Sequence, residues 1–344
     1  MIETTTKTPA ELEQEFYSKP FYMSYSGLNK MLYSPSLWYK HYVLQQREEK
    51  VESYLIDGKV IHTLLLDDGS FEKNFVLLPS SLPTGNSRLI IDKVFSKNEE
   101  YIKGYLPGGT ITLDDFSTDI LNMLIDINLH QSLKTDGQRL TKIITEENNT
   151  YFEFLKTKAN RDIIDSETLQ RCNEAVDILR NHSQTSELLG LYRSEMENIE
   201  MFNEIELSMD KDYTGLSFGL KGIADSIQVN HDKKTIYIND LKTTSKSISD
   251  FEETIKFYNY NLQAAIYDRL VKHVYKDIIK PDWSVIFNFV VIDKYNQVYC
   301  FEVSKSTLSM WGDELTKRLI EADWHYKNKN YNLPYKFAIG PVIL

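Results

Sequence analysis

The second half of the chain contains two segments in which apolar and polar residues alternate, as they do in β-strands. One segment ends at 221–227, the next spans 235–242, and the polar turn 230–234 between them predicts a hairpin. From Asn259 onward apolar residues recur at every fourth position, which predicts a helix. The buried stripe of this helix is predicted to consist of Leu262, Ile266, Leu270 and Val274.

Further strands are predicted on both sides of this hairpin. Residues 195–210 are expected to begin the sheet and to pair with the strand that follows Gly215. Two β-rich runs, Val285–Val291 and Gln297–Val303, are joined by a short turn and predict a closing hairpin or neighbouring strands.

Helices are predicted in three further places, at 55–67, 166–180 and 307–326. Serines precede several helical segments, and a serine hydroxyl can accept a hydrogen bond from a free N–H group of the first turn. Ser24 or Ser26 is predicted to cap a short helix, Ser34-Pro35 to start the next one, and Ser166 to cap the helix at 166–180.

The order of these elements predicts an α/β fold with a central mixed β-sheet flanked by helices and a large, mainly helical insertion. Residues 79–115 are predicted to be loops with one short strand, and residues 114–190 to be mainly helical. No linker or repeat divides the chain, so one elaborated domain is expected. Its parts are an N-terminal helical part (1–78), the insertion (79–194), a sheet with its helix (195–305), and a C-terminal helix with a tail (306–344).

Composition narrows the class of protein. The net charge of −11 argues against a passive, non-specific DNA-binding protein, because phosphate contacts require clustered lysine and arginine. The two cysteines, Cys172 and Cys300, form no CxxC pattern, so neither a disulfide framework nor an iron–sulfur cluster is expected. No apolar run is long enough for a membrane span, and residues 1–15 lack a secretory signal. A cytoplasmic protein of a bacterium or a phage-infected cell is expected.

Two carboxylates and a lysine stand at the end of the predicted hairpin. Asp240 and Lys242 share the face of Ile236 because strand side chains alternate, and Asp225 is expected to lie beside Asp240. Paired carboxylates suit a hard divalent cation such as Mg²⁺, and a nearby lysine can orient a water or, as the neutral amine, deprotonate it. Taken alone, a D-x-K tripeptide is usually a surface salt bridge.

Four short motifs in a fixed order make this chemistry more specific. They are Gly58-x-x-x-His62, Gly222-x-x-Asp225, Asp240-Leu241-Lys242 and Gln263-x-x-x-Tyr267. With them, the chain resembles the PD-(D/E)XK nuclease superfamily, in particular the exonuclease VIII (RecE-type) domains of its RecB-like branch. The connection between Asp225 and Asp240 is longer than is usual in that branch. Ser34 stands where several relatives carry a cluster-binding cysteine, so the resemblance implies no iron–sulfur cluster.

The resemblance implies a restriction-endonuclease-like core and a set of site residues. Its metal ligands for Mg²⁺ or Mn²⁺, as one ion or two, would be Asp225, Asp240, the Leu241 carbonyl, His62 and Glu204. Glu206 lies on the same strand face as Glu204 and remains an alternative. The catalytic group would comprise Asp225, Asp240, Lys242, Gln263 and Tyr267, and the DNA contacts would come from Ser26, Lys30, Thr243 and Lys246.

The function implied by this resemblance is metal-dependent exonuclease action on duplex DNA ends, 5′ to 3′, in recombination or phage DNA metabolism. A homo-oligomeric ring and a single-strand annealing protein are the implied partners. The alternatives are a RecB-like single-strand nuclease of a helicase or defence complex, and a non-catalytic DNA-binding protein on the same fold. The insertion would brace the fold or shape the DNA groove.

Overall fold

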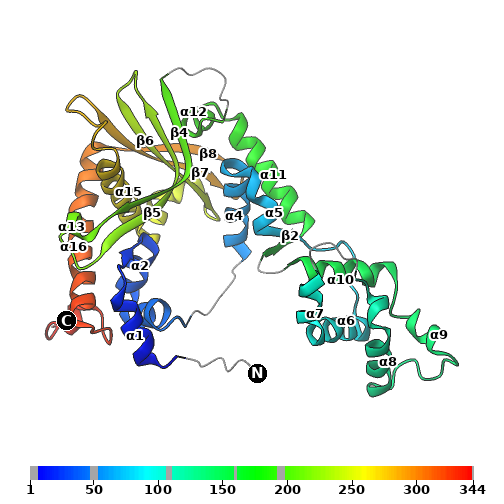
Figure 1. Cartoon of the computed structure of the whole chain (residues 1–344). Helices are drawn as coiled ribbons and strands as arrows, with labels where there is room; N and C mark the ends of the chain where they lie inside the picture. The colour runs from blue at the N-terminus through cyan, green and yellow to red at the C-terminus, as the bar shows by residue number, and fades with distance from the viewer. Residues whose placement is uncertain (1–6, 47–52, 106–110, 159–160, 192–197, 343–344) are drawn as a thin grey trace. The chain divides into compact units, whose positions relative to one another are not determined.

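The computed structural model describes residues 7–46, 53–105, 111–158, 161–191 and 198–342 (Figure 1). The chain forms two compact units, Met1–Asp67 with Glu174–Leu344, and Asp68–Asn173. Among the described residues, no helix combines the length and the apolar character that crossing a bilayer requires.

The first unit is built on a six-stranded mixed sheet. Its strands are β1 (Tyr22–Met23), β4 (Ile199–Met209), β5 (Gly219–Asn230), β6 (Thr235–Thr244), β7 (Ser284–Asp293) and β8 (Val298–Val303). They follow the order β1-β5-β6-β7-β8. β1 and β6 pair with different parts of one edge of β5, and β4 pairs along its opposite edge. The β4–β5, β5–β6 and β7–β8 pairs are antiparallel, whereas β6 and β7 are parallel. The fold class and the two hairpins predicted from the sequence are therefore confirmed.

Helices cover this sheet, as Figure 1 shows. On the side of the main core lie α15 (Tyr260–Val274) and, packed against it, α16 (Lys305–Asn328). The helices α4 (Ser53–Leu66) and α12 (Ser183–Leu189) contact β5 and β6. The remaining helices of this unit are α1 (Pro9–Ser18), α2 (Tyr25–Tyr33), α3 (Pro35–Trp38), α13 (Lys211–Thr214), α14 (Phe251–Tyr258) and α17 (Tyr335–Ala338).

The buried stripe of α15 is shorter than its sequence pattern predicted. Leu262, Ile266 and Leu270 are buried, but Val274 is 44% exposed. Val274 is the last residue of the helix, and Val271 is buried in the final turn instead. The four-residue repeat drifts around the 3.6-residue helix, so a stripe of constant spacing turns away from the core after a few turns.

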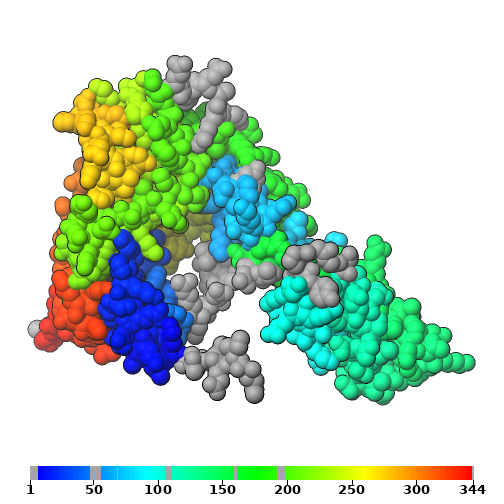
Figure 2. All heavy atoms as spheres, viewed as in Figure 1, coloured from blue at the N-terminus to red at the C-terminus, as the bar shows by residue number. Residues whose placement is uncertain are grey.

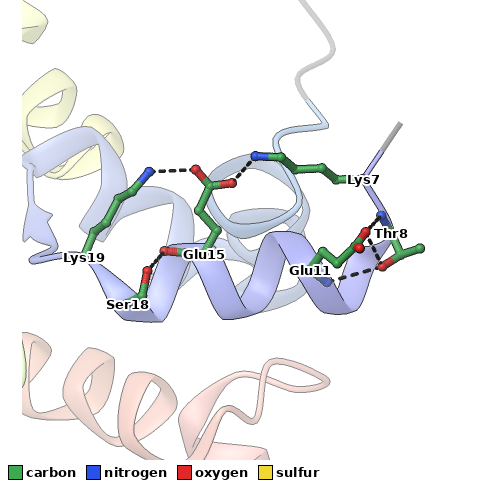
Figure 3. A network of polar contacts seen from close by, with 6 residues as sticks. All are labelled: Lys7, Thr8, Glu11, Glu15, Ser18 and Lys19. Carbon is green, nitrogen blue, oxygen red and sulfur yellow. Dashed lines mark hydrogen bonds and ion pairs between the residues drawn. The ribbon is translucent and has the colours of Figure 1, made fainter. Parts of the chain in front are cut away.

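The N-terminal and C-terminal helices share one aromatic core. Tyr17 of α1 lies 5.1 Å, ring to ring, from Tyr326 of α16, and its hydroxyl is hydrogen-bonded to Tyr331. In Figure 2 the blue N-terminal atoms accordingly lie against the red C-terminal atoms. The start of α1 is fixed by a capping box between Thr8 and Glu11, and Glu15 pairs with Lys7 and Lys19 (Figure 3).

The second unit is mainly helical and has its own core. Its helices are α5 (Phe71–Asn74), α6 (Gly85–Lys97), α7 (Glu99–Tyr105), α8 (Ser117–Asp126), α9 (Asp136–Leu140) and α10 (Glu146–Lys158). Two short strands, β2 (Phe75–Leu77) and β3 (Asp162–Ile164), pair in parallel, and α11 (Ser166–Asn181) leads back to the first unit.

Two sequence predictions fail in this region. Residues 85–105 form helices α6 and α7 rather than loops, because Ile90, Ile91 and Val94 lie on one helical face and are fully buried or nearly so. The predicted loop at Pro107-Gly108-Gly109 lies outside the described residues. Ser166 is the first residue of α11 rather than its cap. The carboxylate of Asp165 accepts a 2.7 Å hydrogen bond from the Thr168 N–H group and so takes the capping role.

Candidate active site

The site forms where β5 and β6 separate. Their ladder runs from Asn230↔Thr235 to Ser226↔Asn239 and stops one step before Asp225 would face Asp240. Further along the same edge of β5, β1 pairs only with Gly219 and Leu220. Residues 221–225 therefore have no ladder partner on this edge, and the strands open into a fork at the two aspartates.

Two side chains replace ladder hydrogen bonds inside the fork. The Asp225 carboxylate accepts a 2.7 Å hydrogen bond from the Leu241 N–H group of β6. The Tyr267 hydroxyl of α15 donates a 2.7 Å hydrogen bond to the Ile223 carbonyl of β5 and accepts one of 3.2 Å from Gln263 Nε2. Gln263 and Tyr267 thus brace the strand that carries Asp225, since buried backbone groups need partners.

Glu204 lies opposite Asp225 on the neighbouring strand and has an unusual backbone. Its φ of 49° is in the left-handed region, which a non-glycine residue enters at a cost of about 1–3 kcal/mol. The pairing of β4 with β5 skips this one position. Core-facing side chains normally recur at every second residue of a strand, but here the step is three residues. Phe202 and Ile205 both face the core in β4, and Ala224 and Ile227 both face it in β5. This break puts Glu204 and Asp225 on the face that does not meet the main core.

Helix α4 brings His62 to the two carboxylates. The ligand atoms of His62, Glu204 and Asp225 all lie within 4.8 Å of one another. His62 Nε2 donates a 2.9 Å hydrogen bond to the Leu241 carbonyl, which leaves Nδ1 facing Glu204 at 3.9 Å and Asp225 at 3.8 Å. Close approach of α4 depends on Gly58, where an added Cβ would lie 3.0 Å from Thr243 Oγ1.

These three side chains fit a divalent cation. In the neutral tautomer, Nδ1 is an acceptor that faces two further acceptors, so the cluster is complete only with a positive charge between them. A proton on His62 is one such charge. Burial lowers the pKa of His62, but Asp225 and Glu204 outweigh that effect and raise it overall. Two carboxylates and an imidazole nitrogen also suit Mg²⁺ or Mn²⁺.

Asp240 and Lys242 form a buried ion pair beside this cluster. Asp240 is fully buried, and its Oδ2 lies 2.6 Å from Lys242 Nζ. Apart from this pair, the Asp240 oxygens have no hydrogen-bond partner among the described residues. Burial raises the pKa of Asp240 above its usual value even though Lys242 opposes that shift. The pKa of Lys242 is also raised, because the attraction of Asp240 and Asp225 outweighs burial.

The predicted metal ligands and the predicted catalytic lysine thus lie in two groups. His62, Glu204 and Asp225 form the ligand cluster, and the Leu241 carbonyl contacts it through His62. Asp240 is absent from the cluster and is paired with Lys242 instead. Glu206, the alternative to Glu204, is exposed and also stands outside the cluster among the described residues.

The four predicted DNA-contacting residues are more scattered. Ser26 and Lys30 lie on α2, where Ser26 Oγ is 3.1 Å from Ser24 Oγ and the Lys30 ammonium donates to His41 Nδ1 at 2.9 Å. Thr243 lies at the end of β6 near Gly58. Lys246 follows β6, and its ammonium lies 5.6 Å from the centre of the Phe257 ring.

Tyr260 is a site residue that the sequence predictions missed. The centre of its ring lies 4.8 Å from Lys242 Nζ, a cation–π distance. Tyr260 precedes Gln263 by three positions and Tyr267 by seven, so the three side chains share one stripe of α15. This spacing of three and seven positions is the sequence signal that could have identified Tyr260.

A sequence profile of the PD-(D/E)XK nuclease superfamily matches residues 128–320, which is more than half of the chain. The chain belongs to the PD-(D/E)XK nuclease superfamily. Such nucleases generally use divalent metals such as Mg²⁺, in keeping with the cluster of His62, Glu204 and Asp225. The matched range contains the fork, the Asp240–Lys242 pair and α15.

The comparison with curated proteins found no match. Among solved structures, the chain is similar to a crystal structure of an Eubacterium rectale protein that was provisionally named an exonuclease. The two share 11% identity over 96% of this chain and 87% of that chain, with a TM-score of 0.43. A similarity at this level carries no argument about the activity of this PD-(D/E)XK protein.

The Gly222 motif has a testable structural role in this superfamily site. A Cβ atom at Gly222 would lie 2.5 Å from Cε1 of the Tyr267 ring, so Gly222→Ala must displace the ring or the strand. We expect a loss of about 1–3 kcal/mol in the free energy of unfolding, measured by urea denaturation. As the matched control, Gly312→Ala in α16 adds a methyl group that meets nothing within 4 Å. Equal stability of the two variants would contradict this packing.

Proposed function

We propose that this protein is a metal-dependent deoxyribonuclease that hydrolyses phosphodiester bonds from the ends of duplex DNA. The observation that supports this best is the cluster of His62, Glu204 and Asp225 beside the Asp240–Lys242 pair, in a chain of a nuclease superfamily. Action from ends, in the 5′ to 3′ direction, comes from the resemblance of the four motifs to exonuclease VIII. The same resemblance suggests a role in recombination or phage DNA metabolism, a ring-shaped oligomer and a cytoplasmic location.

His62, Glu204 and Asp225 would hold Mg²⁺ or Mn²⁺. A bound divalent cation would polarise the scissile phosphate and lower the pKa of a water ligand. Asp225 also accepts a hydrogen bond from the Leu241 N–H group, which fixes the carboxylate within the fork. The positive φ of Glu204 likewise directs that carboxylate toward His62 at a cost in backbone strain.

Lys242 acts as an ammonium in this scheme. Its raised pKa makes deprotonation unfavourable, so it suits orientation of the attacking water and stabilisation of charge on the phosphorus centre. Asp240 holds the ammonium at 2.6 Å, and Tyr260 covers it with its ring. Gln263 and Tyr267 hold β5 and thereby the position of Asp225.

End-dependent cleavage is tested with two substrates of one sequence, a linear duplex and a covalently closed circle. With Mg²⁺ or Mn²⁺ the linear duplex is degraded, the circle is resistant, and a chelator stops the reaction. Label placed at the 5′ end is released before label placed at the 3′ end. If both DNAs remain intact across several pH values and with both metals, the proposal of nuclease activity is overturned. If the circle is cleaved, only the proposal of action from DNA ends is overturned.

A further inference from the structure

A row of aromatic side chains runs from the candidate active site to the surface. The Tyr260 ring lies 4.8 Å from Lys242 Nζ and stacks on Tyr258 with centroids 5.4 Å apart. Phe257 meets the Tyr258 ring edge-on at 4.9 Å. Exposure increases outward, since Tyr258 is 38% exposed and Phe257 is 72% exposed. We call Phe257, Tyr258 and Tyr260 the aromatic row.

The backbone of the aromatic row is hydrogen-bonded to α2. The Tyr258 carbonyl accepts hydrogen bonds from the Tyr25 hydroxyl and from Asn29 Nδ2, the latter at 3.3 Å. Asn259, between α14 and α15, has a φ of 57° and donates a 2.7 Å hydrogen bond to Asn29 Oδ1. The backbone that carries the rings is therefore fixed by α2, which reduces the conformational entropy lost when a ligand binds.

Cations stand at both ends of the aromatic row. Lys242 lies at the inner end, and Lys246 lies 5.6 Å from the Phe257 ring at the outer end. Glu252 and Glu253 lie in the first turn of α14, whereas Phe257 is in its last turn with Lys256. The exposed end of the row is thus flanked by lysines, and the acidic side chains are on the opposite end of the helix.

We propose that the aromatic row binds the bases of an unpaired DNA strand, that Lys246 contacts a phosphate of that strand, and that the row leads it to Lys242. Exposed ring faces beside lysines suit unpaired bases, because stacking on aromatic side chains is available to every base. A duplex offers mainly phosphates and base edges, since its base faces are already stacked on one another. This inference rests on the proposed function and adds the state of the DNA that the site receives.

The test measures binding without cleavage, in the Asp225→Asn background and without metal. A fluorescent oligo(dT) and a blunt duplex of equal length serve as ligands in anisotropy titrations. Phe257→Ala is expected to weaken oligo(dT) binding by roughly tenfold, since the base that stacks on this ring loses its aromatic partner. Binding of the duplex is expected to change by less than about twofold, because its bases do not reach the ring.

Tyr213 provides the matched control. It is 64% exposed and has Lys276 at 5.6 Å from its ring, but it lies beside His273, at the opposite end of α15 from Tyr260. Tyr213→Ala is expected to leave oligo(dT) binding unchanged. Phe257→Leu, which keeps an apolar side chain but has no ring, should repeat the effect of Phe257→Ala and guards against a folding defect. Lys246→Ala should lower the salt slope of binding by about one.

The outcomes separate this inference from the proposed function. If the wild type degrades linear DNA but Phe257→Ala and Phe257→Leu bind oligo(dT) as tightly as Tyr213→Ala, the inference is overturned and the nuclease stands. Equal losses for oligo(dT) and duplex would also overturn it. If the wild type cleaves no DNA while oligo(dT) binding still depends on Phe257, the inference stands and the nuclease fails.

Discussion

Asp225→Asn is expected to abolish DNA cleavage while the protein remains folded. The substitution removes one of the two carboxylate charges facing His62 Nδ1, yet the amide oxygen can still accept the hydrogen bond from the Leu241 N–H group. A metal's stabilisation of transition-state charge is worth several kcal/mol, so we expect kcat/KM to fall by about 10³-fold or more. Initial rates on a linear duplex and the urea midpoint of unfolding measure the two effects separately.

Glu204 and Glu206 provide the control for this prediction. Both are exposed glutamates on β4, but only Glu204 has its carboxylate near His62, at 3.9 Å. Glu204→Gln is therefore expected to lower activity strongly, and Glu206→Gln to leave it close to that of the wild type. The reverse result would show that the metal is held by a different set of residues.

Lys242→Met is expected to lower both activity and stability. Removing one partner of a buried ion pair leaves the other charge without compensation, which costs about 3–5 kcal/mol in the free energy of unfolding. Asp240 is fully buried, so in Lys242→Met its carboxylate would be left buried without a cation beside it. The rate falls because the ammonium that orients water and offsets charge is gone, whereas affinity for Mn²⁺ changes little, since Lys242 is not in the ligand cluster.

The double variant Asp240→Asn with Lys242→Met distinguishes these two losses. It removes both charges, so most of the stability lost in Lys242→Met should return, while activity should not. Urea denaturation and single-turnover cleavage are the measurements. Recovery of activity together with stability would mean that Lys242 serves only to neutralise Asp240.

The sheet and its main helix could be predicted because their patterns are local. Alternation in 235–242 and apolar spacing after Asn259 follow directly from strand and helix geometry. The helices at 85–105 were not predicted because glycine and asparagine side by side favour a turn, although Gly85 is the first residue of α6. Local turn preferences were overridden by the burial of Ile90, Ile91 and Val94.

The site was predictable in its residue types but not in its arrangement. The motifs identified His62, Asp225, Asp240 and Lys242, yet no pattern indicates that β5 and β6 separate between the aspartates. The left-handed backbone of Glu204 depends on packing between strands and has no signature in a sequence of ordinary residues. The ion pair between Asp240 and Lys242 likewise has no signature in the sequence.

Diffraction from crystals soaked in Mn²⁺ tests the central claim most directly, because the anomalous signal locates the ion. The account predicts a peak bounded by His62 Nδ1 and the carboxylates of Glu204 and Asp225, and loss of that peak in Asp225→Asn. A Mn²⁺ ion bound elsewhere in crystals of an active enzyme, with these three side chains unchanged, would contradict it.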